Sequence, residues 1–278
     1  MSAGEAEGRV GMRLLTSELR LVLTRRRNIA GLMILAAVPI LIGIVVRFAG
    51  VGDGAGPPFT SLVAGSGLFL VLTTWVMQMS VFLPMAMCIL AGDAIAGEAH
   101  TGTLRYLLAV PVGRTRLLVI KFASLLIAAP AGVFMVGLVA AATGVTLFGV
   151  GDMVTLSGGR LPSGEASARL LLVGGYISVS LMAVCALGLF ASTLTEQPIG
   201  AAVGTFMWVL IDQILGGFSA LEWLHPFLLS HYWNDWAGLL REPVDWAGAG
   251  VGLVAPAVYI AVFVTAAWAR FTTTDVTS

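Results

Sequence analysis

Three residues near the C-terminal end of the chain have side chains suited to metal binding or acid–base chemistry. His225, His231 and Asp235 fall within one short stretch that also carries several aromatic residues. Imidazole and carboxylate groups bind zinc in many enzymes. Their spacing matches neither His-Glu-x-x-His nor a related zinc-binding pattern, so we expect no metal and no catalytic residue here. A membrane enzyme that uses these three residues at its outer face stays open as an alternative.

Nucleotide hydrolysis is the second kind of chemistry to consider. A phosphate-binding loop requires Gly-x-x-x-x-Gly-Lys-Ser/Thr, but the only lysine of the chain, Lys121, is followed by Phe122. We therefore predict that the chain is not an enzyme and holds no cofactor of its own. Its basic residues are too few, and too close to apolar stretches, to predict a nucleic-acid partner.

The composition predicts where the chain resides. Of its 278 residues, 58% are hydrophobic and only 11% are charged, less than half the charged share of a soluble domain. A soluble protein needs a charged surface, so the missing surface must face lipid. A helix needs about 20 apolar residues to cross a bilayer. Six stretches qualify and predict an all-α integral membrane protein with six transmembrane helices, at 29–46, 66–91, 117–148, 170–194, 198–217 and 246–269.

Prolines and cysteines inside these stretches predict how the helices pack. The prolines are Pro39, Pro84, Pro130 and Pro256. Each removes one backbone hydrogen bond and can kink its helix. Membrane helices tolerate this where neighbouring helices satisfy the freed groups, which predicts one packed bundle. Cys88 and Cys185 also fall inside apolar stretches, so we expect two small buried side chains and no disulfide.

The basic residues predict the orientation. With the N-terminus inside, eleven of them are cytoplasmic and four are external, as the positive-inside rule requires. Six spans then place both termini in the cytoplasm, in a bacterial plasma membrane. We divide the chain into a cytoplasmic N-terminus, 1–28, and a six-span transmembrane domain, 29–278.

Residues 12–27 predict an amphipathic helix that precedes the first span. Met12, Leu15, Leu19 and Val22 recur at helical spacing, and polar residues including several arginines fall on the opposite side. Such a helix suits the headgroup layer of a membrane. A docking surface for a cytoplasmic partner is the alternative, and both can hold together.

The segment between the second and third spans carries the most informative motif. From Gly97 to Lys121 it reads Gly-Glu-x-x-x-Gly-Thr-Leu-x-x-Leu-Leu-x-x-Pro-Val-x-Arg-x-Arg-Leu-Leu-x-x-Lys. Thr101 or Thr103 can cap a short helix with an apolar leucine side, and Pro111 would end it. An ordinary basic loop that only sets the topology is the alternative.

This motif resembles the signature loop of type-2 ABC transporter permeases, the membrane halves of ATP-binding-cassette exporters. A second segment, 228–236, resembles the family less closely, because Ser230 stands where a proline is expected. The resemblance implies that the loop is a cytoplasmic coupling helix, which sits in a groove of a separate ATPase subunit. By resemblance, the residues that couple to the ATPase are Asp93, Glu98, Thr101, Gly102, Thr103 and Arg105.

The same resemblance implies the partners and the activity. Two copies of an ABC ATPase (nucleotide-binding) subunit would bind ATP and magnesium, and a second permease subunit, identical or paralogous, would complete the transporter in the lipid bilayer. The expected activity is export of an amphipathic or lipophilic substrate such as a drug, peptide or lipid. A transporter-like sensor or scaffold that moves no cargo is the alternative.

Two polar residues inside the predicted spans are candidates for the substrate pathway. Asp212 is the only carboxylate within a span, and ionisable groups there are functional candidates. A structural contact with water or with Arg241 is its alternative. Gln78 lies in the middle of the second stretch, where an amide usually bonds across helices.

Glycine pairs at helical spacing allow close approach between helices. They are Gly200 with Gly204, and Gly248 with Gly252. Packing within the chain is one interpretation. For Gly200 and Gly204, a dimer seam at the fifth span is the other.

Overall fold

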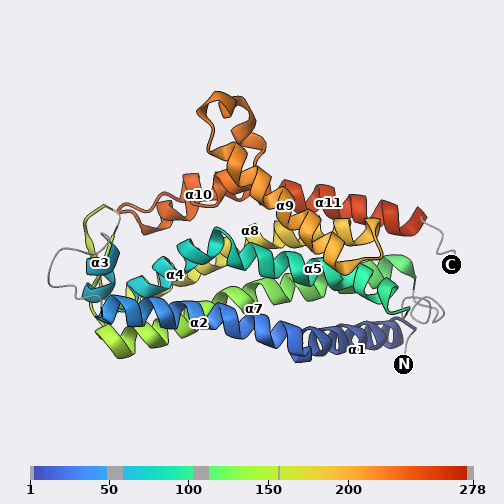
Figure 1. Ribbon diagram of the computed structural model, residues 1–278, viewed down its shortest axis with the longest axis horizontal. Coiled ribbons are helices and arrows are strands. Elements are labelled where there is room, and N and C mark those ends of the chain that lie inside the picture. Colours follow the sequence, from blue (N-terminus) through green and yellow to red (C-terminus); the bar gives the residue numbers. More distant parts are fainter. Residues whose placement is uncertain (1–2, 49–58, 103–112, 156, 274–278) are drawn as a thin grey trace.

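The computed structural model describes residues 3–48, 59–102, 113–155 and 157–273 and consists almost entirely of helices (Figure 1). Six helical stretches are long and apolar enough to cross a membrane, so the chain is an all-α integral membrane protein, as predicted. The helices are α1 Ala3–Thr24, α2 Arg26–Phe48, α3 Phe59–Gly65, α4 Phe69–Met79, α5 Phe82–His100, α7 Arg114–Phe148, α8 Ser163–Leu194, α9 Pro198–Gly216, α10 Trp246–Gly252 and α11 Val254–Thr273. A short hairpin, β1 Met153–Val154 and β2 Arg160–Leu161, joins α7 to α8.

Helix α8 forms the centre of the bundle and is the most buried of the spans. Small residues let its neighbours approach closely. A Cβ atom added to Gly188 of α8 would lie 2.6 Å from Ala91 Cβ of α5, and one added to Gly92 would lie 2.7 Å from the Ala202 backbone of α9. Larger side chains at these points would force α5, α8 and α9 apart.

The second predicted span is divided into two helices. Stretch 66–91 becomes α4 and the first half of α5, and Val81 between them has a non-helical backbone, with φ −142° and ψ −56°. Pro84 explains this position, because it has no N–H for the carbonyl of Ser80, four residues earlier, and its ring clashes with that carbonyl. Gln213 of α9 donates a 3.0 Å hydrogen bond to the freed Ser80 carbonyl instead.

The same arrangement recurs at Pro39, inside α2. Pro39 cannot donate to the carbonyl of Leu35, and Gln78 of α4 supplies the missing hydrogen bond at 2.9 Å. Two glutamines on neighbouring helices thus replace two hydrogen bonds that prolines remove, which confirms the predicted packing. Pro256 lies in the first turn of α11, where a proline costs little.

Both described ends of the chain lie at one end of the bundle, which we call the terminal end (Figure 1). Arg114, the first residue of α7, donates to the carbonyls of Phe271 and Thr272 near the end of α11. Trp268 donates to Thr115 Oγ1 at 3.0 Å. The start of α7 and the end of α11 are therefore joined directly.

Helix α1 packs against α7 and α2 at the terminal end. Leu15, Leu19 and Val22 are half-buried, whereas Arg13 and Arg20 are exposed. The predicted amphipathic helix is confirmed, and Leu15, Leu19 and Val22, three of the four apolar side chains that predicted it, face the rest of the chain.

We call residues 218–245 the lateral segment. Part of it projects from the side of the bundle beyond the end of α9 (Figure 1), whereas Leu229, Trp233 and Leu240 pack in the core. The segment forms three 3₁₀ helices, η1 Ser219–Phe227, η2 Ser230–Tyr232 and η3 Asp235–Leu240. Long polar side chains of the spans hold them by their carbonyl groups. Tyr176 donates to Tyr232 at 2.7 Å, Tyr259 donates to Phe227 at 2.9 Å, and Arg169 donates to Arg241 at 2.9 Å.

Candidate functional site: a charged cluster at the terminal end

Lys121 lies at the centre of the charged cluster. Its side chain is 6% exposed and its ammonium group contacts the carboxylates of Glu18, at 2.9 Å, and Glu98. These acids come from α1 and α5, and their side chains are 14% and 12% exposed. Burying an ammonium group costs free energy unless groups of opposite charge lie close to it. Lys121 therefore joins α7 to two other helices.

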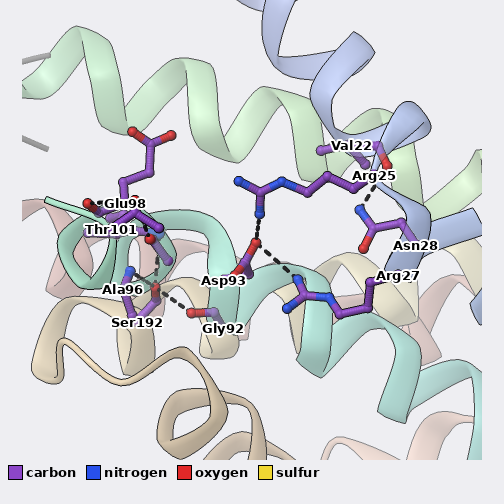
Figure 2. A network of polar contacts seen from close by, with 12 residues as sticks. Val22, Arg25, Arg27, Asn28, Gly92, Asp93, Ala96, Glu98, Thr101 and Ser192 are labelled. Atoms are coloured by element: carbon purple, nitrogen blue, oxygen red, sulfur yellow. Dashed lines mark hydrogen bonds and ion pairs between the residues drawn. The ribbon is translucent and has the colours of Figure 1, made fainter. Parts of the chain in front are cut away.

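A second set of ion pairs surrounds Asp93, one helical turn before Glu98 (Figure 2). Its carboxylate contacts the guanidinium group of Arg25 and that of Arg27, the latter at 3.0 Å. Arg25 lies between α1 and α2, and Arg27 in the first turn of α2. Asn28 also donates to the Val22 carbonyl across the same junction, at 2.7 Å. Asp93 thus ties α5 to the point where α1 turns into α2.

The side chain of Ser192 on α8 makes hydrogen bonds to the backbone of α5 near these two acids (Figure 2). Its hydroxyl accepts from the amides of Ile95, at 3.0 Å, and Ala96, at 2.8 Å, and donates to the Gly92 carbonyl at 2.9 Å. Ser192 is 1% exposed. The charged end of α5 is therefore anchored to the central helix, and a movement of this end would be passed to α8.

Helix α5 extends further than predicted. The sequence placed Asp93 and Glu98 in a loop, but both lie on α5, which continues to His100. Gly102, with a positive φ of 72°, ends the helix, and its backbone N–H donates a hydrogen bond to the Ala99 carbonyl. Helices commonly end at a glycine in this way. The Thr101 hydroxyl donates to the Gly97 carbonyl at 3.0 Å.

Thr101, one of the two predicted caps, is the C-cap of α5. The other predicted cap, Thr103, lies outside the described residues, as does Arg105. The predicted coupling helix falls on the same part of the chain. Of the four other predicted coupling residues, Asp93 and Glu98 lie in the last turns of α5, Thr101 is its C-cap and Gly102 follows directly.

The cluster is suited to transmitting movement between helices, because its charges balance and its residues come from different helices. Three carboxylates, of Glu18, Asp93 and Glu98, face three cations, of Arg25, Arg27 and Lys121. If one charged group moves away, its partner is left buried without a compensating charge, which costs free energy. Helices α1, α2, α5 and α7 are therefore expected to move together at this end.

Sequence reasoning missed Glu18 and Ser192 and did not place Lys121 among the site residues. Glu18 carried a signal, because it lies between Leu15 and Val22 on the apolar side of an amphipathic helix, where an acid needs a partner. Lys121 was the last residue of the motif and the only lysine of the chain. Ser192 carried no signal, because its contacts lie about a hundred residues away in the sequence.

The two polar candidates within the spans make bonds to backbone groups. Gln78 is 0% exposed between α4 and α2. Asp212 is 5% exposed and accepts from the amides of Leu229, at 3.0 Å, and Ser230, at 2.7 Å. Asp212 thus fixes the start of η2. This is a structural contact, as the alternative proposed, but its partners are these two backbone amides and not Arg241. A role of either residue in a substrate pathway stays a prediction.

The glycine pairs differ in their surroundings. A Cβ added to Gly252 would lie 2.2 Å from Tyr176 Oη, so Gly252 packs within the chain, whereas Gly204 has no atom within 4 Å of that position. At Gly200 the nearest atom is 3.6 Å away. The surface around Gly200 and Gly204 is open in the described part of the chain.

The histidines of the lateral segment lie side by side, with 5.5 Å between the ring centres of His225 and His231. Asp235 packs beside Gly252 of α10. Burial raises the pKa of the Asp235 carboxyl above its usual range, His231 lowers it and Asp245 raises it further. Within the described residues, no three His, Cys, Asp or Glu side chains are grouped so that they could hold a metal.

Two comparisons with known proteins bear on this arrangement. A family described as "Protein of unknown function (DUF2705)" matches residues 31–277. A protein of Pseudomonas aeruginosa named "Probable ABC transporter permease protein NosY" is 29% identical over 213 residues, which cover 74% of this chain and 69% of that relative. The matched region includes five of the six spans in full and all but the first residues of α2.

Proposed function

We propose that this chain, which belongs to the DUF2705 family, is the membrane-spanning permease subunit of an ABC transporter of the type-2 class. The motif from Gly97 to Lys121 carries the proposal. Similarity to a probable ABC transporter permease supports it. In this proposal the terminal end is cytoplasmic, and ATP is hydrolysed by two copies of a separate ATPase subunit.

The charged cluster is the feature that suits energy coupling. The ATPase would press on the end of α5 and on the residues that follow Gly102. Glu98 and Asp93 would pass that movement to α7 and to the α1–α2 junction, because both acids have cationic partners there. Ser192 would pass it to α8. Rigid helices joined in this way move as one body.

A second permease subunit completes the proposed transporter. Helix α9 exposes large apolar side chains on one side, including Ile199, Val203 and Met207. Gly200 and Gly204 leave room for a close neighbour beside them, and close approach at small residues drives association of membrane helices. A dimer seam along α9 follows, formed by a second copy or by a paralogue.

The direction and the cargo are proposed on the resemblance to exporters. Movement would be outward, and the cargo amphipathic or lipophilic. A transporter-like sensor that moves nothing is distinguished in vesicles that contain the permease and its ATPase. Cargo that stimulates hydrolysis and also moves supports transport, whereas stimulation without movement indicates a sensor.

A cysteine at His100 tests the central claim, since His100 is exposed at the end of α5 and both native cysteines are buried. A photoreactive maleimide on His100→Cys should crosslink to the ABC ATPase subunit in cells that produce both proteins. Asp152→Cys, exposed beside the β-hairpin, is the matched control and should give no such product. An impermeant maleimide that labels His100→Cys from outside intact cells would overturn the proposal, as would a crosslink to no nucleotide-hydrolysing protein.

A further inference from the structure

A pocket of about 440 Å³ lies beside the lateral segment, away from the charged cluster. Its walls come from the α4–α5 break, the end of α9, η2 and the turn that follows η2. Six of the lining residues have polar side chains: Ser80, Gln213, Ser230, His231, Trp233 and Asn234. The pocket has room for an organic molecule and not only for water.

The broken span explains why a polar pocket exists in an apolar bundle. Pro84 interrupts the helix and frees the Ser80 carbonyl, and Gln213 reaches across to bond it. Bonds to backbone amides also fix the opposite wall, because Asp212 holds Leu229 and Ser230. The pocket is thus framed by polar groups whose positions are set by the fold.

The pocket offers hydrogen bonds without a full charge. None of its lining residues is Asp, Glu, Lys or Arg. Two carboxylates neighbour lining residues in the sequence. Asp212, before Gln213, is almost fully buried and already accepts hydrogen bonds from two backbone amides, and Asp235, after Asn234, packs beside Gly252 of α10. Apart from the imidazole of His231, a charged ligand would meet no lining side chain that could form an ion pair, so the loss of its hydration would be unfavourable.

One wall residue still has an unmet donor. Trp233 is 5% exposed, and its indole N–H has no hydrogen-bond partner within the described residues. A buried donor without an acceptor costs free energy. The amide groups of Gln213 and Asn234 add further donors to the same walls. A ligand that brings acceptor oxygens matches this set.

We propose that this pocket binds an uncharged organic molecule that carries hydrogen-bond acceptor oxygens, such as an amide, an ester or a polyol. The inference rests on the proposed function in one respect only, namely that the bound molecule would belong to the class of the transported cargo. The binding step itself involves this chain alone, so it can be measured without the ATPase.

Three photoreactive probes of nearly equal size test the pocket on the full chain in lipid nanodiscs. They are 4-benzoylbenzamide, which is neutral, 4-benzoylbenzoate, an anion, and 4-benzoylbenzylamine, a cation. Met79 lines the pocket and is a good target for benzophenone. We expect the neutral probe to label peptides containing Met79, 213–217 or 230–234 several-fold more than the charged probes. Excess biphenyl-4-carboxamide should suppress this labelling.

Gly216→Leu should fill the pocket, because Gly216 lines it and a Cβ there meets only side-chain atoms, at 3.7 Å and beyond. Labelling should fall at least about fivefold, whereas Gly175→Leu, at another open glycine, should label as the wild type does. Asn234→Leu is a second variant, for the case that Gly216→Leu does not fold, and should also reduce labelling.

Equal labelling by the three probes would overturn the inference, as would undiminished labelling of both pocket variants. If the pocket is labelled specifically but the chain binds no ATPase, the proposed function is contradicted and the binding pocket is still supported. If labelling is not specific but position 100 still crosslinks to the ATPase, only the binding pocket is contradicted.

Discussion

The charged cluster at the terminal end is joined by ion pairs, whereas the α4–α5 break is joined by polar side chains that donate to backbone carbonyls. At the terminal end, Lys121 and Asp93 each contact two groups of opposite charge. At the break, Gln78 and Gln213 each donate to a carbonyl that a proline has freed.

The two kinds of interaction differ in how strongly they fix the geometry of the helices that they join. Hydrogen bonds to fixed carbonyls depend strongly on distance and angle, so they hold the kinks of α2 and of the α4–α5 pair in one geometry. Ion pairs depend less on direction and act over a longer range, so they keep helices together while side chains adjust. A permanent pocket suits the first kind of region, and transmission of movement suits the second.

The largest expected effect is at the charged cluster, with Lys121→Met. This change leaves Glu18 and Glu98 facing each other with no cation between them. Breaking a buried pair by removing one partner costs about 3 kcal/mol or more. We expect a loss of about 3 kcal/mol in the free energy of unfolding, measured by reversible unfolding in mixed micelles.

Two further variants sharpen this result. Lys121→Arg keeps the positive charge and should retain most of the stability. The double variant Lys121→Met/Glu98→Gln removes one of the two acids that Lys121 contacts and should recover part of the loss, as a coupled pair requires. A stability of Lys121→Met equal to that of the wild type would show that the cluster does not hold the helices together.

The spans were predictable because each depends on a local run of apolar residues, and the kinks because Pro39 and Pro84 act on carbonyls four residues earlier. The partners were not. Gln78 and Leu35 are 43 residues apart, and Lys121 and Glu18 are 103 apart, so only the packing of the helices brings them together. The end of α5 was misplaced because Asp93 and Glu98 were interpreted as loop residues, although Gly102 carried the glycine signal of a helix end.

The next effect concerns the break region, with Gln78→Leu. The Leu35 carbonyl then stays buried without a donor, which costs about 2 kcal/mol. Pro39→Ala restores an N–H for the same carbonyl. In the double variant Gln78→Leu/Pro39→Ala, the loss should therefore be clearly smaller than in Gln78→Leu alone, measured by the same unfolding method.

An exposed glutamine gives the matched control for this cycle. Gln197 lies before α9 and is exposed, so Gln197→Leu should leave stability nearly unchanged. If Pro39→Ala lowers the stability of Gln78→Leu further, the glutamine does not act by replacing the hydrogen bond that the proline removes.

The smallest effect is expected at the exposed edge of the charged cluster, with Arg27→Gln. The Arg27 side chain is 52% exposed and Arg25 also contacts Asp93, so the loss should be about 0.5 kcal/mol. In about 1 M salt, charges are screened beyond roughly 3 Å, and the difference from the wild type should vanish. Arg26→Gln, on an exposed neighbour, controls for the general loss of one positive charge. A Lys121→Met loss that persists in the same salt would separate the buried centre of the cluster from its edge, since burial protects an ion pair from screening.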